Sequence, residues 1–281
     1  MDPSAAPAPS LLAGRYQLRE LIGQGAAGRV YRARDEFLQQ DVAVKISRNG
    51  AADSADARRQ QRELKILQRL AHPGLVVLLD AGVDVQEMAN PRTYLVMELV
   101  EGSNLRQRLK NGLVPRGDAM QWSVDLLQSL AYVHAEGVVH RDIKPANILI
   151  PAGDAGTGRS ARLSDFGLAI VLGNTPLTMQ GTTTGTAAYL SPEQATGELV
   201  ETPSDIYSLG LVLLECLTGV VAFPGPPLES IVGRLVRSPA VPEDLGAWVP
   251  VLRAMTARLP QDRPSAAEAA AMLAPGVAVP A

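Results

Sequence analysis

The sequence is poor in the residues from which disulfide bonds and zinc centres are built. It contains one cysteine, Cys216, and three histidines, with no His-Glu-x-x-His spacing. An intramolecular disulfide and a zinc site built from cysteines or histidines are therefore excluded. Cys216 lies in the apolar run 209–217, and we interpret it as a core residue. Lysine is also scarce, and the only four are Lys45, Lys65, Lys110 and Lys144. Each lysine is thus a candidate for a specific role.

Long apolar runs and an excess of one charge are missing as well. Glu215 interrupts the strongest apolar segment, so no membrane-spanning helix is predicted in this chain. The 26 basic and 29 acidic residues nearly cancel, which argues against nucleic acid or an anionic membrane surface as a partner. Residues 1–13 are rich in Pro, Ala and Ser and lack the positive start and apolar core of a signal peptide. We expect them to be a disordered leader, and the protein to be cytoplasmic.

The pattern of the sequence changes once along the chain. Short alternating or β-branched runs predict strands in the first part, at residues 16–18, 29–31, 42–44, 75–79 and 94–97. A helix is predicted between the third and fourth of these runs, over residues 55–70. From Asn104 onward helical periodicity dominates, so the first part is mostly β and the second mostly α.

The composition break near Gly102 predicts two lobes joined by a short link. We place an N-lobe at 14–97, a hinge at 98–102, a C-lobe at 103–274 and a frayed tail at 275–281. The first long helix of the C-lobe is predicted to end before Gly137. The expected core face of that helix consists of Met120, Val124, Leu127, Ala131 and His134.

The segment Gly23–Gly28 matches G-x-G-x-x-G, a pattern that dinucleotide folds and ordinary turns also contain. A dinucleotide fingerprint opens a helix, whereas a strand pattern follows Gly28, so we predict a hairpin turn. Such a turn can place its N–H groups over a triphosphate because no Cβ blocks the approach. A flexible turn without a ligand is the alternative. Because the chain has no Gly-Lys-Ser/Thr sequence, Lys45 is the candidate phosphate-binding cation, with Glu63 as its acidic partner.

A second polar cluster, His140–Asn147 followed by Asp165, fits phosphoryl transfer. That reaction needs positioning, charge neutralisation and a group that orients the attacking hydroxyl. Asp142 is the candidate base, and Asn147 and Asp165 offer the oxygen ligands that suit Mg²⁺. Lys144 follows Asp142 by two residues, so both side chains project to the same side of an extended loop.

Because it contains these motifs, the chain resembles a eukaryotic-type (Hanks-type) Ser/Thr protein kinase over residues 16–273. The matching segments, in family order, are Gly23–Val30, Val42–Lys45, Glu63, His140–Asn147, Asp165–Gly167, Ser191–Glu193, Asp205 and Arg263. The resemblance implies an α+β bilobal protein-kinase fold, with a small antiparallel-β N-lobe carrying one main helix and a larger, mainly α-helical C-lobe. The Arg-, Ala- and Gly-rich composition is similar to that of proteins from GC-rich bacteria.

The resemblance also implies a role for each motif residue. Lys45 would hold the α- and β-phosphates of ATP and pair with Glu63, Asp142 would accept the hydroxyl proton, and Asn147 and Asp165 would bind Mg²⁺. The implied ATP-binding set is Ile22, Gly23, Gly25, Gly28, Val30, Ala43, Lys45, Met97, Glu98, Val100, Leu149 and Asp165. Plain core packing is the alternative for each apolar member.

Several further positions resemble the structural framework of the family. Leu67, His140 and Phe166 resemble a packed column, and Asp205 would hydrogen-bond the backbone of the catalytic loop. Glu193 and Arg263 resemble a buried ion pair under the substrate platform.

The implied substrate is a protein with Ser or Thr acceptors. The Asp-x-Lys-Pro-x-Asn pattern resembles the Ser/Thr branch, and Thr186 supports it because the family places this hydroxyl near the base and Lys144. Arg141 would bind a phosphate on the activation segment. The expected modification is autophosphorylation among Thr178 and Thr182–Thr184, with dimerisation for transfer in trans; an unmodified polar loop is the alternative.

Two other functions compete with this one. A pseudokinase or scaffold would bind nucleotide without transfer, and the small residue Ala27 at the loop tip points that way. The presence of Lys45, Asp142 and Asp165 argues against it. A small-metabolite kinase is disfavoured by the peptide-platform residues, Thr186 among them.

Overall fold

A computed structural model of the chain describes residues 11–25, 28–47, 64–85, 92–153, 160–165 and 187–273. The chain divides into two compact units. The first contains the described residues up to Leu70 together with residues 77–99, and the second contains residues 71–76 and the described residues from Val100 onward. Among the described residues, the chain thus passes between the units for the last time within the predicted hinge.

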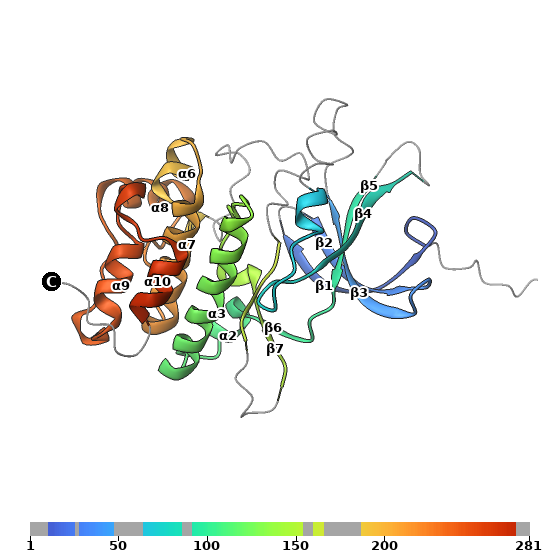
Figure 1. The fold of residues 1–281 in the computed structure, drawn as a ribbon, viewed down its shortest axis with the longest axis horizontal. Helices are drawn as coiled ribbons and strands as arrows, with labels where there is room; N and C mark the ends of the chain where they lie inside the picture. The colour runs from blue at the N-terminus through green and yellow to red at the C-terminus, as the bar shows by residue number, and fades with distance from the viewer. Residues whose placement is uncertain are drawn as a thin grey trace, which may run out of the picture. The chain divides into compact units, whose positions relative to one another are not determined.

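The first unit is built on a five-stranded antiparallel sheet in the order β1-β2-β3-β5-β4 (Figure 1). The strands are β1 (Tyr16–Gly25), β2 (Gly28–Asp35), β3 (Gln40–Ser47), β4 (Leu78–Asp84) and β5 (Arg92–Glu98). Four of the predicted strand runs lie within these elements and are confirmed.

The strand predicted at 75–79 is wrong in its bounds. β4 begins only at Leu78, because the two residues at the start of the apolar run pair elsewhere. Leu75 forms an isolated parallel bridge with Leu163, and the Val76 N–H donates to the Leu163 carbonyl at 2.8 Å. This pairing belongs to the second unit.

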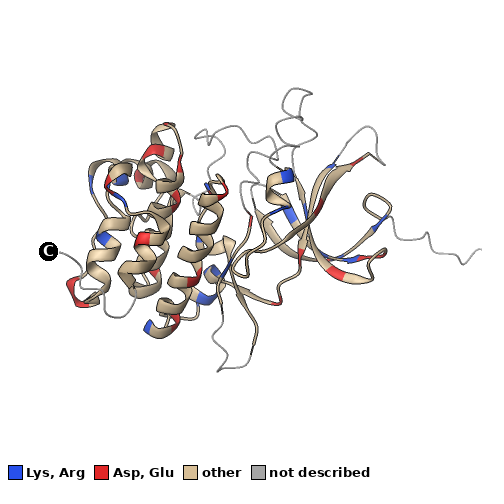
Figure 2. Cartoon of the chain, in the orientation of Figure 1, with Lys and Arg blue, Asp and Glu red and all other residues tan. Residues whose placement is uncertain are grey.

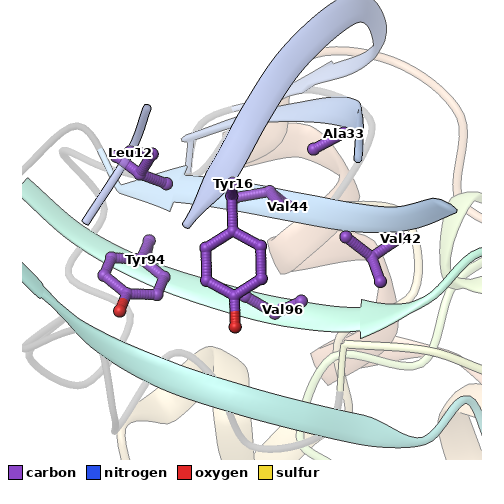
Figure 3. Close-up of a cluster of buried hydrophobic side chains, with 7 residues drawn as sticks. All are labelled: Leu12, Tyr16, Ala33, Val42, Val44, Tyr94 and Val96. Carbon is purple, nitrogen blue, oxygen red and sulfur yellow. The ribbon is translucent and has the colours of Figure 1, made fainter. Parts of the chain in front are cut away.

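The hydrophobic core of the first unit lies on one face of its sheet (Figure 3). Seven buried side chains form it, namely Leu12, Tyr16, Ala33, Val42, Val44, Tyr94 and Val96. Leu12 corrects the predicted leader: its side chain is buried and its N–H donates to the Tyr16 carbonyl at 2.9 Å. Leu12 is therefore part of the folded N-lobe, while residues 1–10 lie outside the described residues.

Only the end of the helix predicted at 55–70 is described. Residues 64–67 are helical, and Leu67 and Leu70 are buried. Residues 55–63, including Glu63, lie outside the described residues.

The second unit combines helices with a small antiparallel sheet in the order β6-β7-β8. Its helices are α2 (Leu105–Leu109), α3 (Arg116–Ala135), α6 (Pro192–Thr196), α7 (Thr202–Thr218), α8 (Pro227–Val236), α9 (Trp248–Met255) and α10 (Ala266–Leu273). Its strands are β6 (Gly102–Asn104), β7 (Ile148–Pro151) and β8 (Arg162–Leu163), and its short 3-10 turns are η1 (Pro145–Asn147), η2 (Glu243–Leu245) and η3 (Pro260–Asp262). Figure 2 shows basic and acidic residues scattered together over these helices.

Helix α7 forms the centre of the second unit and packs against α3 and α9. Twelve of its 17 residues are buried, Cys216 among them, and burial raises the pKa of the Cys216 thiol to about 12. The interpretation of this cysteine as a core residue is confirmed. Within the part of the chain that the structure describes, no helix has both the length and the apolar character needed to cross a membrane.

Helix α3 buries a different face from the one predicted. Its fully buried apolar residues are Ala119, Trp122, Leu126, Leu127, Leu130 and Val133. Of the predicted face only Leu127 is fully buried. The buried face is centred on Trp122, Leu126, Leu130 and Val133, so it is rotated around the helix from the predicted one. The predicted end is confirmed, since Gly137 has φ +73° and its N–H donates to the His134 carbonyl.

Tyr16→Phe tests the polar anchor of the first core. The Tyr16 hydroxyl donates to Asp80 Oδ2 at 2.6 Å, and a hydrogen bond to a charged acceptor contributes roughly 1.5–3 kcal/mol. Because Asp80 is partly exposed, we expect the free energy of unfolding in urea to fall by about 1.5 kcal/mol.

Tyr94→Phe is the matched control for this substitution. The Tyr94 ring lies 5.9 Å from that of Tyr16, and its hydroxyl has no hydrogen-bond partner among the described residues. We expect a loss below about 0.5 kcal/mol. Equal losses in the two variants would show that the Tyr16 hydroxyl does not anchor the core.

Candidate active site

The loop between α3 and β7 brings three predicted site residues together. Lys144 Nζ donates to both carboxylate oxygens of Asp142, at 2.8 and 2.7 Å. Asn147 Nδ2 donates to the Asp142 backbone carbonyl at 2.8 Å and to its carboxylate at 3.0 Å. The backbone at Lys144 is extended, with φ −159° and ψ 161°. The prediction that the side chains of Asp142 and Lys144 project to the same side of the loop is confirmed.

The start of this loop is held by one buried carboxylate on α7. Asp205 accepts the backbone N–H groups of His140 and Arg141, each at 2.8 Å, and the His134 ring nitrogen at 2.9 Å. Asp205 is almost completely buried. The predicted contact between Asp205 and the loop backbone is confirmed. It stabilises a strained conformation, because Arg141 is a non-glycine residue with φ +68°.

The β7–β8 hairpin places Asn147 and Asp165 at the same end of a small sheet. Ile148 pairs with Leu163, and one step further along the hairpin the Ser164 N–H and hydroxyl both donate to the Asn147 carbonyl, at 2.9 and 3.1 Å. Asp165 follows directly and has φ +63°. Two oxygen-bearing side chains, an amide and a carboxylate, are therefore adjacent in register although they are distant in sequence.

The first unit carries its own group of predicted residues on one sheet face. Lys45 lies opposite Val30 on β2 and opposite Leu95 on β5. Ala43 lies opposite Met97. Because directly opposed residues share a face and neighbours along a strand alternate, these five residues lie on the face opposite the cluster of Figure 3.

Lys45 is the one buried lysine among the described residues, with 6% of its surface exposed. The neighbouring residues Val30, Ala43, Leu95 and Met97 on its face are apolar, whereas Arg32 and Asp41 lie further along the same face. The strand register therefore places the ammonium group of Lys45 next to an apolar patch. Of the other predicted nucleotide contacts in this unit, Glu98 ends β5, and Ile22 on β1 is about half exposed.

The glycines of β1 and β2 differ in whether neighbouring atoms leave room for a side chain. A Cβ on Gly28 would lie 2.1 Å from the Ile46 carbonyl oxygen, and its φ of +150° excludes other residues. A Cβ on Gly23 would make only an ordinary contact with Val30, and one on Gly25 would meet no described atom within 4 Å. Packing of the described residues therefore explains Gly28 but not Gly23 or Gly25.

Several predicted site residues cannot be placed against these groups. Glu63, Ala27, Phe166, Thr186 and the activation-segment threonines lie outside the described residues. Val100, Leu149 and Asp165 belong to the second unit, and the other described members of the predicted nucleotide-binding set belong to the first.

The sequence model of the family described as "Protein kinase domain" matches residues 16–272. The chain belongs to this family. It is 40% identical over 237 residues to the serine/threonine-protein kinase PknB of Mycobacterium leprae, covering 83% of this chain and 37% of that protein. It is 39% identical over 222 residues to the serine/threonine-protein kinase PrkC of Bacillus subtilis, covering 78% and 33%. The predicted family and the α+β kinase fold are confirmed, and the chain spans about a third of the length of these bacterial relatives.

Helix α6, which follows the loop that carries Asp142 in the chain, is fixed by a buried ion pair. Arg263 donates to both carboxylate oxygens of Glu193, at 2.7 and 2.9 Å, and the Ser204 hydroxyl donates to the same carboxylate. Burial alone would raise the pKa of Glu193, but the hydrogen bonds from Arg263 and Ser204 outweigh it, and the pKa is lowered. The carboxylate therefore stabilises the fold at neutral pH, and this contribution is lost as the pH falls through the lowered pKa.

Sequence reasoning missed a second buried arginine, Arg234 on α8. It is fully buried and donates to the carbonyls of Ala187, Leu190 and Ser230. Its guanidinium lies over the Phe223 ring, 5.0 Å from the centroid. Burial lowers its pKa to about 10, so it remains charged at neutral pH. These bonds fix the backbone at Ala187 and Leu190, which precede α6. Only the apolar neighbours of Arg234 on α8 could have signalled its burial.

Arg263→Met tests the ion pair of α6. Removing one partner of a buried pair leaves an uncompensated charge, so we expect the free energy of unfolding to fall by about 3–5 kcal/mol. Arg253→Met is the matched control, because Arg253 pairs with Glu243 on the exposed surface, where such pairs contribute about 0–1 kcal/mol. Guanidinium denaturation of both variants measures the difference. A loss below about 1 kcal/mol for Arg263→Met would refute the stabilising role of the pair.

Proposed function

We propose that this chain is an ATP-dependent protein serine/threonine kinase that transfers the γ-phosphoryl group to Ser and Thr hydroxyls. The observation that carries the proposal is the bonded group of Asp142, Lys144 and Asn147 on a loop fixed by Asp205. The kinase names of the relatives support it. Protein substrates with Ser or Thr acceptors follow from this activity, and dimerisation for transfer in trans stays a prediction.

The residues at the end of the β7–β8 hairpin fit the metal that this reaction uses. Asn147 and Asp165 provide one amide and one carboxylate oxygen donor, both hard ligands. Mg²⁺ prefers such oxygens and normally takes only one or two protein carboxylates, with water and phosphate oxygens completing its shell. Among the described residues no cluster of three His, Cys, Asp or Glu side chains offers a rival metal site. When bound, Mg-ATP supplies the phosphoryl group and neutralises its charge.

The loop residues have separate tasks in the transfer. Asp142 has a carboxylate that accepts the proton of the attacking hydroxyl and orients that oxygen. Asn147 fixes the Asp142 carboxylate through its Nδ2 group, and Lys144 supplies a positive charge beside it. The Asp142 side chain keeps 32% of its surface exposed, so a substrate hydroxyl can reach it.

The first unit supplies the nucleotide-binding groups. Val30, Ala43 and Met97 offer an apolar face for the adenine ring, and Lys45 on the same face offers the charge for the phosphates. No described atom lies within 4 Å of the position of a Cβ on Gly25, and a Cβ on Gly23 would meet only the Val30 side chain. Both glycines therefore leave room for phosphate oxygens close to the main chain.

Arg141 supports regulation through the activation segment. Its Nε atom is buried and has no hydrogen-bond partner among the described residues, which is costly for a guanidinium group. A phosphate on a threonine of the activation segment could satisfy this donor. We therefore propose autophosphorylation among Thr178 and Thr182–Thr184, with Arg141 as the receiving residue.

Asp142→Asn tests the proposed activity. We expect radiolabel transfer to a generic protein acceptor to fall by about 10²–10⁴-fold, because the amide cannot accept the hydroxyl proton. Nucleotide binding, measured by calorimetry, should persist. Asp244→Asn is the control, since it makes the same chemical change at an exposed surface position. Equal labelling by the wild type and Asp142→Asn would refute the enzyme, and binding without transfer by the wild type would identify a pseudokinase.

Phosphopeptide mass spectrometry after incubation with Mg-ATP tests the modification. We expect phosphate on at least one of Thr178 and Thr182–Thr184, and none on the same peptides of Asp142→Asn. An active wild-type enzyme whose activation segment stays unmodified would rule out this regulation.

A further inference from the structure

We propose that Gln194 is a positioning residue for phosphoryl transfer, acting through the backbone carbonyl of Arg141. The proposal rests on the kinase activity proposed above. Gln194 Nε2 donates to the Arg141 carbonyl oxygen at 2.7 Å, and the Gln194 side chain is buried, with 7% of its surface exposed. The bond joins α6 to the residue directly before Asp142.

The contact orients the peptide group that carries Asp142. Its carbonyl oxygen, from Arg141, accepts Gln194 Nε2, and its N–H, from Asp142, donates to His140 Nδ1 at 3.3 Å. On the loop backbone, Asp205 accepts the N–H groups of His140 and Arg141, which precede this peptide group in the chain. Rotation of the Arg141–Asp142 peptide plane would swing the Asp142 carboxylate, and of these contacts the one from Gln194 fixes the oxygen end of that plane.

Strain at Arg141 makes this contact necessary. Its φ of +68° costs of order 1–3 kcal/mol for a non-glycine residue and persists only where the surroundings enforce it. Hydrogen bonds from two different helices hold it, through the Asp205 carboxylate on α7 and the Gln194 amide on α6.

Gln194 is itself fixed, which allows it to position another group. Its Oε1 accepts the Ser191 N–H at 2.9 Å, and its own N–H donates to the Ser191 hydroxyl, which forms a capping box at the start of α6. The neighbouring residue Glu193 is held by the buried pair with Arg263. The Gln194 amide therefore uses its oxygen for the helix cap and its nitrogen for the catalytic loop.

A second capping box provides the comparison. Gln107 on α2 makes the same reciprocal bonds with Asn104, at 3.0 and 2.9 Å, but it is exposed and is bonded to no catalytic-loop residue in the described structure. Glu also serves at this position of a capping box. Gln→Glu at either site keeps the cap and replaces the amide donor with an acceptor.

The test compares Gln194→Glu with Gln107→Glu in steady-state assays on a protein acceptor. At about pH 7.5, where an ordinary carboxyl group is ionised, we expect kcat of Gln194→Glu to be about tenfold below that of the wild type, because its carboxylate repels the Arg141 carbonyl and a small misplacement of a reacting group is costly. The KM for ATP should be unchanged, and Gln107→Glu should match the wild type. The thermal unfolding midpoint of Gln194→Glu should fall, because its carboxylate is buried beside a carbonyl oxygen, so kcat is compared well below that midpoint.

The pH dependence separates positioning from a general structural role. The carboxyl group that Gln194→Glu introduces can again donate to the Arg141 carbonyl once it is protonated. The ratio of kcat of this variant to that of the wild type should therefore rise toward one as the pH falls to about 5.5, closer to the usual pKa of a carboxyl group. The titratable and charged groups bonded around this contact are Arg141, Asp142, Lys144, Asp205, the rings of His134 and His140, and the Glu193–Arg263 pair. All of them are common to both proteins and cancel in the ratio.

Three results would overturn the proposal: kcat of Gln194→Glu equal to that of the wild type, an equal loss in Gln107→Glu, or a kcat ratio independent of pH. If Gln194→Glu does not fold, Gln194→Met tests the same donor without the charge. A folded Gln194→Met with full kcat would overturn the proposal as well. Absence of transfer by the wild type would instead refute the proposed function.

Discussion

The arrangement of the second unit depends on the buried Asp205 carboxylate. It lies in α7, the central helix of the unit, and binds two successive backbone N–H groups and a histidine ring. A carboxylate without these partners would be costly to bury, and the loop without the carboxylate would leave two N–H groups unsatisfied. Each therefore requires the other. The catalytic loop is consequently attached to the rigid centre of the domain and not to its surface.

Backbone register performs the same task in both units. In the first, strand pairing alone places Lys45 beside Val30 and Leu95. In the second, the β7–β8 hairpin places Asn147 beside Ser164 and hence next to Asp165. Side chains that are far apart in the sequence become neighbours through main-chain hydrogen bonds, which do not depend on the chemistry of the side chains they align.

The sequence was most informative where chemistry restricts the residue type. Asp142, Lys144 and Asn147 could be predicted because a base, a cation and an amide have few substitutes, and Asp205 was predicted from the resemblance to the kinase family. The core face of α3 could not be predicted, since apolar residues surround much of that helix and periodicity alone does not choose among its faces. Leu12 escaped prediction because the Leu11–Leu12 pair at the end of a Pro/Ala-rich stretch gives no periodic signal.

The roles of Arg234 and Gln194 could not be predicted from the sequence for a related reason. Both bind backbone carbonyls, and a carbonyl has no sequence signature. Arginine and glutamine are usually solvent-exposed, so burial had to come from tertiary packing. Residues that act on the main chain of another segment can be found only once the two segments are placed together.

The β7–β8 hairpin has a consequence for engineering. Residues 152–161 connect its two strands, whose alignment is set by their own ladder. Because closing a longer loop costs only slightly more entropy, this connection is the place to open the chain for circular permutation or to insert a reporter domain. The two oxygen donors at the opposite end of the ladder would remain adjacent whichever way the polypeptide was reconnected.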